Sequence, residues 1–225
     1  MKINVPRFEL KDAIQGLSKV LPRKSALPIL QAIRFKSIDG SLSATVTDLD
    51  QTLTYRFESA MIEGDVESFM LDARHLQPLA KGRDEDLIRF EPESKDRMAV
   101  INCIAGRDIR TVVDMLDPKE WPADPVAIIT QPVDDKFLPT VRRALPFASK
   151  DESRYILQSI CLDASDRAQR IVATDGRRLT SLPTCTLPLK ESCILPATKF
   201  LAWNRLDGSA AVGVEKVSDT AWFRV

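Results

Sequence analysis

Two stretches of this chain occur twice, in the same order and at the same separation. The segment 155–162 (YILQSICL) resembles the segment 28–35 (PILQAIRF) and starts 127 positions further along the chain. The segment 173–180 (ATDGRRLT) resembles the segment 46–53 (VTDLDQTL), and its offset is also 127. Because a shared offset of this kind is the signature of duplication, we interpret the chain as two copies of one structural module.

A third pair extends the repeat toward the end of the chain. The segment 194–200 (ILPATKF) aligns with 70–76 (MLDARHL) at an offset of 124, so only three positions are lost over a whole module. The 225 residues therefore divide into a first module over 1–125 and a second over 126–225. The second copy is shorter, so we expect it to lack its last strands and to leave a sheet edge unpaired.

Hydrophobic periodicity predicts the same mixture of elements in both copies. Apolar residues at helical spacing indicate amphipathic helices, and short apolar runs bounded by turn residues indicate strands. The expected helices cover 7–21, 74–82, 136–145 and 198–206. The expected strands cover 29–37, 42–47, 52–57, 87–90, 98–104 and 109–113, and the proline-punctuated segment 117–125 is expected to be a linker. This pattern predicts an α+β fold in which the helices lie on one side of antiparallel sheets.

Composition is that of a globular protein. Hydrophobic residues make up 44% of the chain, and apolar runs such as 126–129 are far shorter than the roughly 20 residues of a membrane helix. The N-terminal segment MKINVPRFEL has no apolar core of a signal peptide, so we expect a cytoplasmic protein that does not bind membranes. Four cysteines without a CxxC pair, beside a single histidine, are typical of free thiols, and we expect no metal or other cofactor.

Charge is segregated although the chain as a whole is neutral. The expected helical segments carry net charges of +1 over 7–21 and +2 over each of 72–83, 134–150 and 197–206, which together give +7. The rest of the chain must then carry −7. Basic helices on acidic modules are typical of a surface that follows a phosphate backbone without reading base sequence. A solvated helix face that simply collects lysines and arginines is the alternative interpretation.

Catalytic chemistry finds little support. A nucleophile and base arrangement would have to use His75, which has no catalytic signature around it. Asp48 and Asp50 have a spacing that suits Mg²⁺, but carboxylates that cap a turn explain the same pattern, and the second copy replaces Asp50 by Arg177. The chain contains neither a GxxxxGK[ST] loop nor a GxGxxG loop. We therefore predict a protein that is not an enzyme.

Several motifs together resemble one family, the bacterial sliding clamp, which is the β subunit of DNA polymerase III. These motifs are SALPIL at 25–30, DGSLSATVTDLD at 39–50, RYIL at 154–157 and VATDGRRL at 172–179, and they follow the family's order over essentially the whole chain. The resemblance implies duplicated modules with helices on the inner face of a ring and antiparallel sheets outside. Family members have three modules per subunit, whereas this chain has one module and most of a second.

The resemblance also implies two kinds of site. Positions similar to the family's DNA-contacting residues, together with two arginines added from the charge argument, are Lys24, Arg74, Arg142, Arg143, Lys150 and Lys199. Half of the family's partner-peptide pocket corresponds to Leu157, Thr174, Gly176, Arg177, Arg178 and Leu179. Arg177 stands where the family usually has histidine. We expect Leu157, Thr174 and Leu179 to form an apolar depression edged by Arg177 and Arg178.

Three functions follow from these observations. The first is a homo-oligomeric DNA clamp, a replication processivity factor that encircles or tracks double-stranded DNA and tethers the replicative DNA polymerase after a clamp loader places it. The second is a shortened clamp relative that forms no ring and binds a full clamp, a polymerase or a clamp loader. The third is an enzyme that uses Asp48 and Asp50 with Mg²⁺. The mass of the protein in solution separates the first function from the second.

Overall fold

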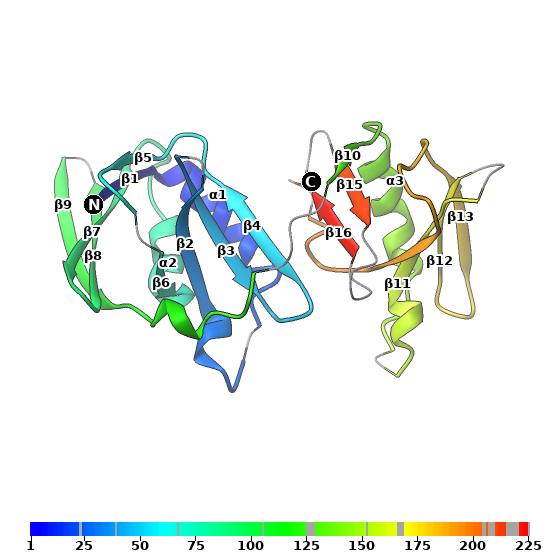
Figure 1. Cartoon of the computed structure of the whole chain (residues 1–225), viewed down its shortest axis with the longest axis horizontal. Helices are drawn as coiled ribbons and strands as arrows, with labels where there is room; N and C mark the ends of the chain where they lie inside the picture. Colours follow the sequence, from blue (N-terminus) through cyan, green and yellow to red (C-terminus); the bar gives the residue numbers. More distant parts are fainter. Residues whose placement is uncertain are drawn as a thin grey trace. The chain divides into compact units, whose positions relative to one another are not determined.

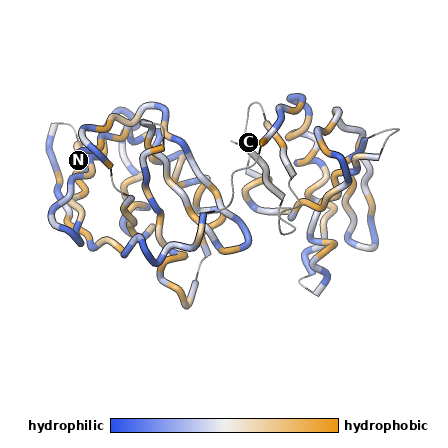
Figure 2. Tube along the Cα trace, in the orientation of Figure 1, coloured by the Kyte–Doolittle hydropathy of each residue, from blue (hydrophilic) through white to orange (hydrophobic). Residues whose placement is uncertain are grey.

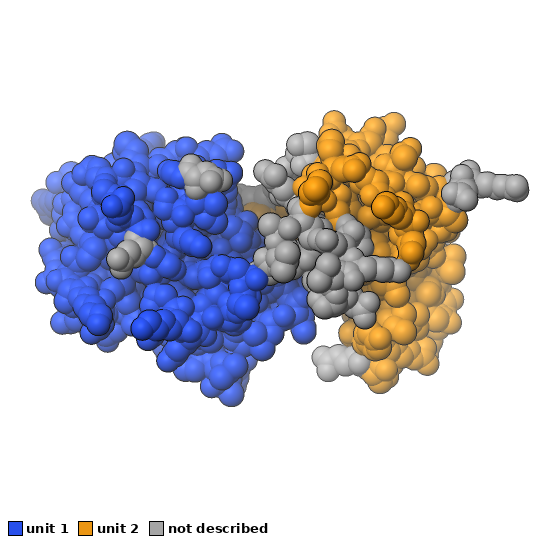
Figure 3. All heavy atoms as spheres, viewed as in Figure 1, with its two compact units in different colours: residues 1–125 blue, residues 126–225 orange. Residues whose placement is uncertain are grey.

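The chain divides into two compact units, which we describe from a computed structural model (Figure 1). The structure describes residues 1–22, 24–38, 40–66, 68–104, 106–124, 129–151, 153–165, 169–203, 206, 210–214 and 221–224. Unit 1 comprises Met1–Pro125 and unit 2 comprises Val126–Val225 (Figure 3). Within the described part of the chain, no helix is both long and apolar enough to cross a membrane.

Unit 1 consists of two antiparallel sheets and one main helix. Its strands are β1 (Lys2–Pro6), β2 (Ala32–Ile38), β3 (Ser41–Thr47), β4 (Thr52–Arg56), β5 (Met61–Glu63), β6 (Phe69–Asp72), β7 (Leu87–Ser94), β8 (Arg97–Ile104) and β9 (Arg107–Asp114). Its helices are α1 (Arg7–Leu17), α2 (Ala73–Leu76) and the 3-10 helices η1 (Pro28–Gln31), η2 (Gln77–Ala80) and η3 (Pro118–Glu120). One sheet has the strand order β5-β1-β7-β8-β9, and the other has the order β4-β3-β2-β6.

An aromatic cluster joins the two sheets of unit 1. Phe35 on β2 stacks on Phe69 of β6 with ring centroids 5.0 Å apart, and it lies 5.5 Å from Phe90 of β7 in the other sheet. The apolar face of α1, which includes Leu10 and Leu17, packs against the same core. Hydrophobic residues recur between hydrophilic ones along the trace of both units (Figure 2). This alternation places one face of each sheet in the core.

Unit 2 repeats this plan with fewer strands among its described residues. Its strands are β10 (Gln131–Pro132), β11 (Ser159–Asp163), β12 (Arg170–Thr174), β13 (Leu179–Pro183), β14 (Cys193–Pro196), β15 (Ala211–Val214) and β16 (Ala221–Arg224). Its helices are α3 (Phe137–Ala144) and the 3-10 helices η4 (Leu145–Phe147) and η5 (Tyr155–Gln158). The sheets have the orders β13-β12-β11-β14 and β10-β15-β16, and α3 buries Phe137, Leu138 and Val141 in the core of the unit.

Strand register repeats between the four-stranded sheets of the two units. Arg34 of β2 lies opposite Thr45 of β3, and Cys161 of β11 lies opposite Val172 of β12. Each residue of the second pair stands 127 positions after its equivalent, as the sequence repeat requires. The order β13-β12-β11-β14 matches β4-β3-β2-β6, and β10-β15-β16 matches β1-β7-β8. The prediction of an α+β fold with duplicated antiparallel sheets is confirmed.

The predicted helices are shorter than their hydrophobic patterns indicate. Helix α1 ends at Leu17, and residues 18–20 continue only as a turn before Pro22. The helix expected over 198–206 is wrong for the described residues, because 199–202 form turns and residues 204 and 205 lie outside the described part. There the N–H of Trp203 donates to the carbonyl of Phe200, which is a tight turn closed over three residues.

The segment expected to be a linker belongs to unit 1 up to Asp124. Trp121 packs against the small apolar cluster around Ile29 and Met70, and the guanidinium of Arg34 lies 4.6 Å from the centre of its ring. Arg34 also forms an ion pair with Asp124. Proline punctuation marks this segment as irregular, but it does not reveal that an aromatic residue anchors the segment to the fold.

Candidate partner-binding pocket and nucleic-acid interface

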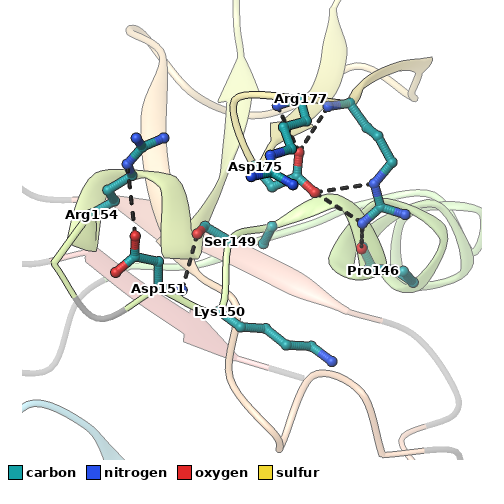
Figure 4. Close-up of a pocket in the computed structure, with 9 residues that line it drawn as sticks. Pro146, Ser149, Lys150, Asp151, Arg154, Asp175 and Arg177 are labelled. Atoms are coloured by element: carbon teal, nitrogen blue, oxygen red, sulfur yellow. Dashed lines mark hydrogen bonds and ion pairs between the residues drawn. The ribbon is translucent and has the colours of Figure 1, made fainter.

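A hollow of about 620 Å³ lies on unit 2, where the turn between β12 and β13 faces the segment 146–154 (Figure 4). Four of the residues around it are cations and two are carboxylates. The lining consists of Pro146, Ala148, Ser149, Lys150, Asp151, Arg154, Asp175, Arg177 and Arg178. The hollow is therefore polar and has an excess of positive charge.

The turn Thr174–Arg178 is built by two side chains that bond to its own backbone. The Thr174 hydroxyl donates to the carbonyl of Arg178 at 2.7 Å and accepts the N–H of Gly176 at 3.0 Å. One carboxylate oxygen of Asp175 accepts the N–H of Arg177 at 2.9 Å and that of Arg178 at 2.8 Å. Such side-chain bonds stabilise a turn locally. They hold the backbone of residues 176–178 in place.

Asp175 is held in its ionised form by this geometry. The backbone N–H groups of Arg178 and Arg177 lower the pKa of Asp175 to about 2, and the Arg178 guanidinium, 3.0 Å away, acts in the same direction. Arg178 also donates to the carbonyl of Pro146 at 3.2 Å and lies 5.4 Å from the ring centre of Phe147. Arg178 thereby links the turn to the segment that follows α3.

We expect the stabilisation by Asp175 to disappear at low pH. Its folded-state pKa lies below the ordinary value of 3.8, so its contribution is fully present above about pH 4 and is lost as the pH falls toward 2. In urea titrations, Asp175→Asn should therefore lower the free energy of unfolding at pH 5 and make a smaller difference at pH 2.5. An equal difference at both pH values would contradict this assignment.

Glycine at position 176 allows Arg154 to lie against the turn. Gly176 has a φ of +85°, and a Cβ built there would lie 3.0 Å from Nη1 of Arg154. Both the backbone conformation and the close approach favour glycine. Arg154 pairs with Asp151 at 3.8 Å, and Figure 4 shows this pair on the opposite side of the hollow from Asp175.

The predicted pocket residues lie near this hollow, but the expected apolar depression does not form its lining. Leu157 and Thr174 are partly buried, and the hydroxyl of Thr174 forms its two hydrogen bonds within the turn. Leu179 begins β13 and is 64% exposed. Of the predicted pocket set, Arg177 and Arg178 line the hollow. The hollow itself is polar, and the partner-peptide pocket expected from the sequence stays a prediction.

Several residues of the hollow were absent from the sequence prediction. Arg154 and Asp151 supply one wall, and Tyr155 and Ile156 beside them are 75% and 53% exposed. The RYIL motif contains three of these four residues and is the signal that could have identified them. Lys150, which was predicted to contact DNA, also lines the hollow.

Three of the predicted DNA-contacting cations lie on or just after α3. Arg142 and Arg143 occupy the last turn of this helix, and Arg143 is exposed. Arg142 is partly buried, and its Nε and Nη2 atoms are buried without a hydrogen-bond partner among the described residues. Lys150 is exposed in the segment that follows η4. The structure thus places two of these cations in the last turn of α3 and the third in the segment that follows η4.

The other predicted cations are dispersed. Lys24 is exposed between α1 and η1, and Lys199 is exposed in the turn after β14. Arg74 on α2 is exposed and donates to both carboxylate oxygens of Asp72, with a shortest distance of 2.7 Å. The net charge of +2 over 72–83 already includes this pair, so Lys81 and Arg83 carry that net charge.

Arg7 corrects the charge argument, because it is an internal residue. Its side chain is fully buried, and its guanidinium donates to the carbonyls of Leu79 and Lys81 at 2.6 and 2.7 Å. It also pairs with Asp86 at 3.3 Å and donates to the side chain of Asn102. Glu9 of the same helix is also buried, so one positive and one negative charge of the sum face the interior. Arg205, which also entered that sum, lies outside the described residues.

The Asp48 carboxylate caps a turn. Its Oδ1 atom accepts the N–H of Asp50 at 3.1 Å and that of Gln51 at 2.7 Å, which is the turn-capping interpretation given above. The described residues contain no group of three or more His, Cys, Asp and Glu side chains arranged to hold a metal ion. These bonds explain the DLD pattern without magnesium.

Comparisons with known proteins point to a single family. A family model described as "DNA polymerase III beta subunit, N-terminal domain" matches residues 1–124. The beta sliding clamp of Chlamydia muridarum is 26% identical over 187 residues, which cover 82% of this chain and 50% of the relative. That of Escherichia coli K12 is 24% identical over 195 residues, which cover 85% of this chain and 51% of the relative. The chain thus spans about half the length of the curated relatives it matches.

The fold agrees with these matches. The crystal structure of the DNA polymerase III beta subunit from Thermotoga maritima is 25% identical, with a TM-score of 0.77 over 96% of this chain and 59% of that one. The family model covers more than half of the 225 residues, and the register of the two four-stranded sheets repeats at the offset seen in the sequence. The chain therefore belongs to the DNA polymerase III beta subunit family, the bacterial sliding clamps.

Proposed function

We propose that this chain acts as a sliding-clamp-like processivity factor in DNA replication. In this function it encircles or tracks double-stranded DNA without sequence specificity and tethers the replicative polymerase, with a clamp loader as a further partner. Homo-oligomerisation is part of the proposal, because two modules surround less of a duplex than several copies do. The proposal contains no catalytic step and no cofactor, and it implies the bacterial cytoplasm as the compartment.

The observation that carries the proposal is the group of cations at the end of α3. Arg142 and Arg143 lie next to each other in the last turn of this helix, and Lys150 follows after η4. Arg143 and Lys150 are exposed, so their side chains can reach the phosphate oxygens of a duplex, whereas Arg142 is partly buried. Contacts of this kind bind the DNA backbone and carry no base information.

The hollow on unit 2 is the proposed docking site for replication partners. Arg177 and Arg178 belong to its lining, and Leu179, Tyr155 and Ile156 add exposed apolar surface beside it. A short partner segment with apolar and acidic residues matches this chemistry. In this proposal the partly buried Leu157 and Thr174 have a structural role in the site, and Gly176 allows the turn its backbone conformation.

We expect replacement of Arg142 and Arg143 by glutamate to weaken binding to duplex DNA and to reduce its salt dependence. Each phosphate contact contributes about 0.9 to the slope of log K against log salt, so losing two contacts should reduce the slope by about 2. Fluorescence anisotropy with two labelled duplexes of unrelated sequence, measured over a salt series, gives both quantities. The two duplexes should bind alike.

A matched control makes the same charge change elsewhere. Arg107 and Arg110 lie on β9 and are exposed, so their double glutamate variant should retain most of the DNA affinity and slope. A sequence-specific footprint, a salt-independent affinity or equal losses in both double variants would contradict the proposal.

The charged edge of unit 1 favours a second candidate function. The edge strand β9 exposes Arg107, Asp108 and Arg110, and charged residues on an edge discourage pairing with another sheet. A shortened clamp relative that forms no ring and binds a full clamp, a polymerase or a clamp loader would need no edge pairing. A monomer that binds an intact clamp would favour this candidate, and a stable oligomer that retains circular DNA would favour the ring.

A further inference from the structure

The turn at the end of the β3–β4 hairpin repeats the turn of the hollow bond by bond. The Thr47 hydroxyl donates to the carbonyl of Gln51 at 2.9 Å and accepts the N–H of Leu49 at 3.1 Å. Asp48 accepts the N–H groups of Asp50 and Gln51, as Asp175 does for Arg177 and Arg178. The two turns therefore present their intervening residues on the same backbone.

The side chains that the two turns present differ in charge, and at one position the charges are opposite. Asp50 occupies the position of Arg177, and Gln51 that of Arg178, at the offset of 127. Leu49 occupies the position of Gly176, with a φ of 80° against 85°. The unit 1 turn is thus acidic and apolar, whereas the unit 2 turn is basic.

Leu49 is an unusual residue for this conformation. A leucine with positive φ costs about 1–2 kcal/mol, and its side chain is 61% exposed, so little core packing offsets that cost. Backbone strain at an exposed residue is typical of a residue that binds another molecule, because such strain persists mainly at functional sites. Here the contact would involve one apolar side chain flanked by the exposed carboxylate of Asp50.

The hollow on unit 2 has the complementary chemistry. Lys150, Arg154 and Arg177 supply positive charge, while Tyr155 and Leu179 supply exposed apolar surface next to it. The Asp175 carboxylate already accepts hydrogen bonds from the backbone of its own turn. An incoming group that combines a leucine and a carboxylate therefore meets both an apolar contact and cations, of which Arg154 already pairs with Asp151.

We infer that the hairpin end formed by Leu49 and Asp50 of one copy docks at the unit 2 hollow of a second copy. Every chain carries both partners of this contact, one on each unit, so the contact is heterologous and repeats from head to tail. It goes beyond the proposed tethering function, because it assigns the hollow a second occupant from the protein itself. A partner peptide with apolar and acidic residues would compete with it.

Charge reversal in the full-length chain tests this contact. Asp50→Arg and Arg177→Asp should each weaken the concentration-dependent self-association seen by sedimentation velocity at least about tenfold, since each places like charges together. An equimolar mixture of the two variants should recover association, because Arg at 50 then meets Asp at 177 and the native Asp50 meets the native Arg177. Glu85→Arg makes the same charge change at another exposed site and should associate like the wild type.

A second variant keeps the test independent of folding. Leu49→Asn tolerates positive φ and should weaken association without lowering the free energy of unfolding. A wild-type mass that stays at that of one chain at every concentration, association unaffected by either reversal, or no recovery in the mixture would each overturn the inference. The α3 arginines are not part of this contact, so its failure would leave the DNA measurement unchanged.

Discussion

Replacing Arg7 by methionine should lower the free energy of unfolding by about 3–5 kcal/mol, which is the range for breaking a buried ion pair by removing one partner. The guanidinium is fully buried and satisfies the carbonyls of Leu79, Lys81 and Arg83 together with the side chains of Asp86 and Asn102. Methionine has a similar length but donates nothing, so all five acceptors lose their partner. Urea titration followed by far-UV circular dichroism measures the loss.

Lys11→Met is the matched control for Arg7. Lys11 lies on the same helix and pairs with Asp84 at 3.2 Å, but Asp84 is exposed and Lys11 is only partly buried. An exposed pair contributes only about 0–1 kcal/mol, so this variant should unfold almost like the wild type. Equal losses in the two variants would mean that the Arg7 network contributes no more than a surface ion pair.

Replacing Phe35 by alanine should also cost about 3–5 kcal/mol, because it removes the ring that joins the two sheets of unit 1. Phe35 is fully buried and contacts both Phe69 and Phe90. The cavity left between β2 and β7 would have apolar walls and would remain dry, so no water offsets the lost packing.

Phe8→Ala tests whether the loss at Phe35 comes from burial. Phe8 is 45% exposed at the start of α1, so its truncation should cost well under half as much. The same urea titration compares the two variants. A larger loss at Phe8 than at Phe35 would place the critical apolar contact on the helix and not between the sheets.

The sequence repeat was sufficient to predict the duplicated architecture, because strand register follows residue spacing directly. Arg34 and Cys161 are equivalent in both sequence and sheet, since an offset of 127 preserves the inward and outward alternation of each strand. The prediction of a helix over 198–206 was wrong because hydrophobic spacing does not determine backbone conformation. Its apolar residues have helical spacing, yet Leu201 and Leu206 reach the core from turns, and periodicity alone cannot distinguish these cases.

The candidate site was predictable as a location but not in its chemistry. The TDGRR and RYIL motifs lie at the hollow, and Arg177 and Arg178 line it as expected from sequence. Whether Leu179 faces the hollow depends on how β13 leaves the turn, which residue types do not specify. Arg7 shows the same limit for charge, because a cation in an amphipathic helix looks like surface until its acceptors, far apart in sequence, are known.

The paired threonine and aspartate in each turn have a consequence for how a duplicated protein diversifies. Because Thr47 with Asp48, and Thr174 with Asp175, bond to the backbone of each turn, the two positions after the positive-φ residue, 50–51 and 177–178, can change identity without refolding the loop. Mutation can therefore alter the surface of one copy while the other copy keeps its own. The turn keeps its backbone while its exposed side chains change. It is therefore a suitable site for grafting a new recognition sequence into this chain.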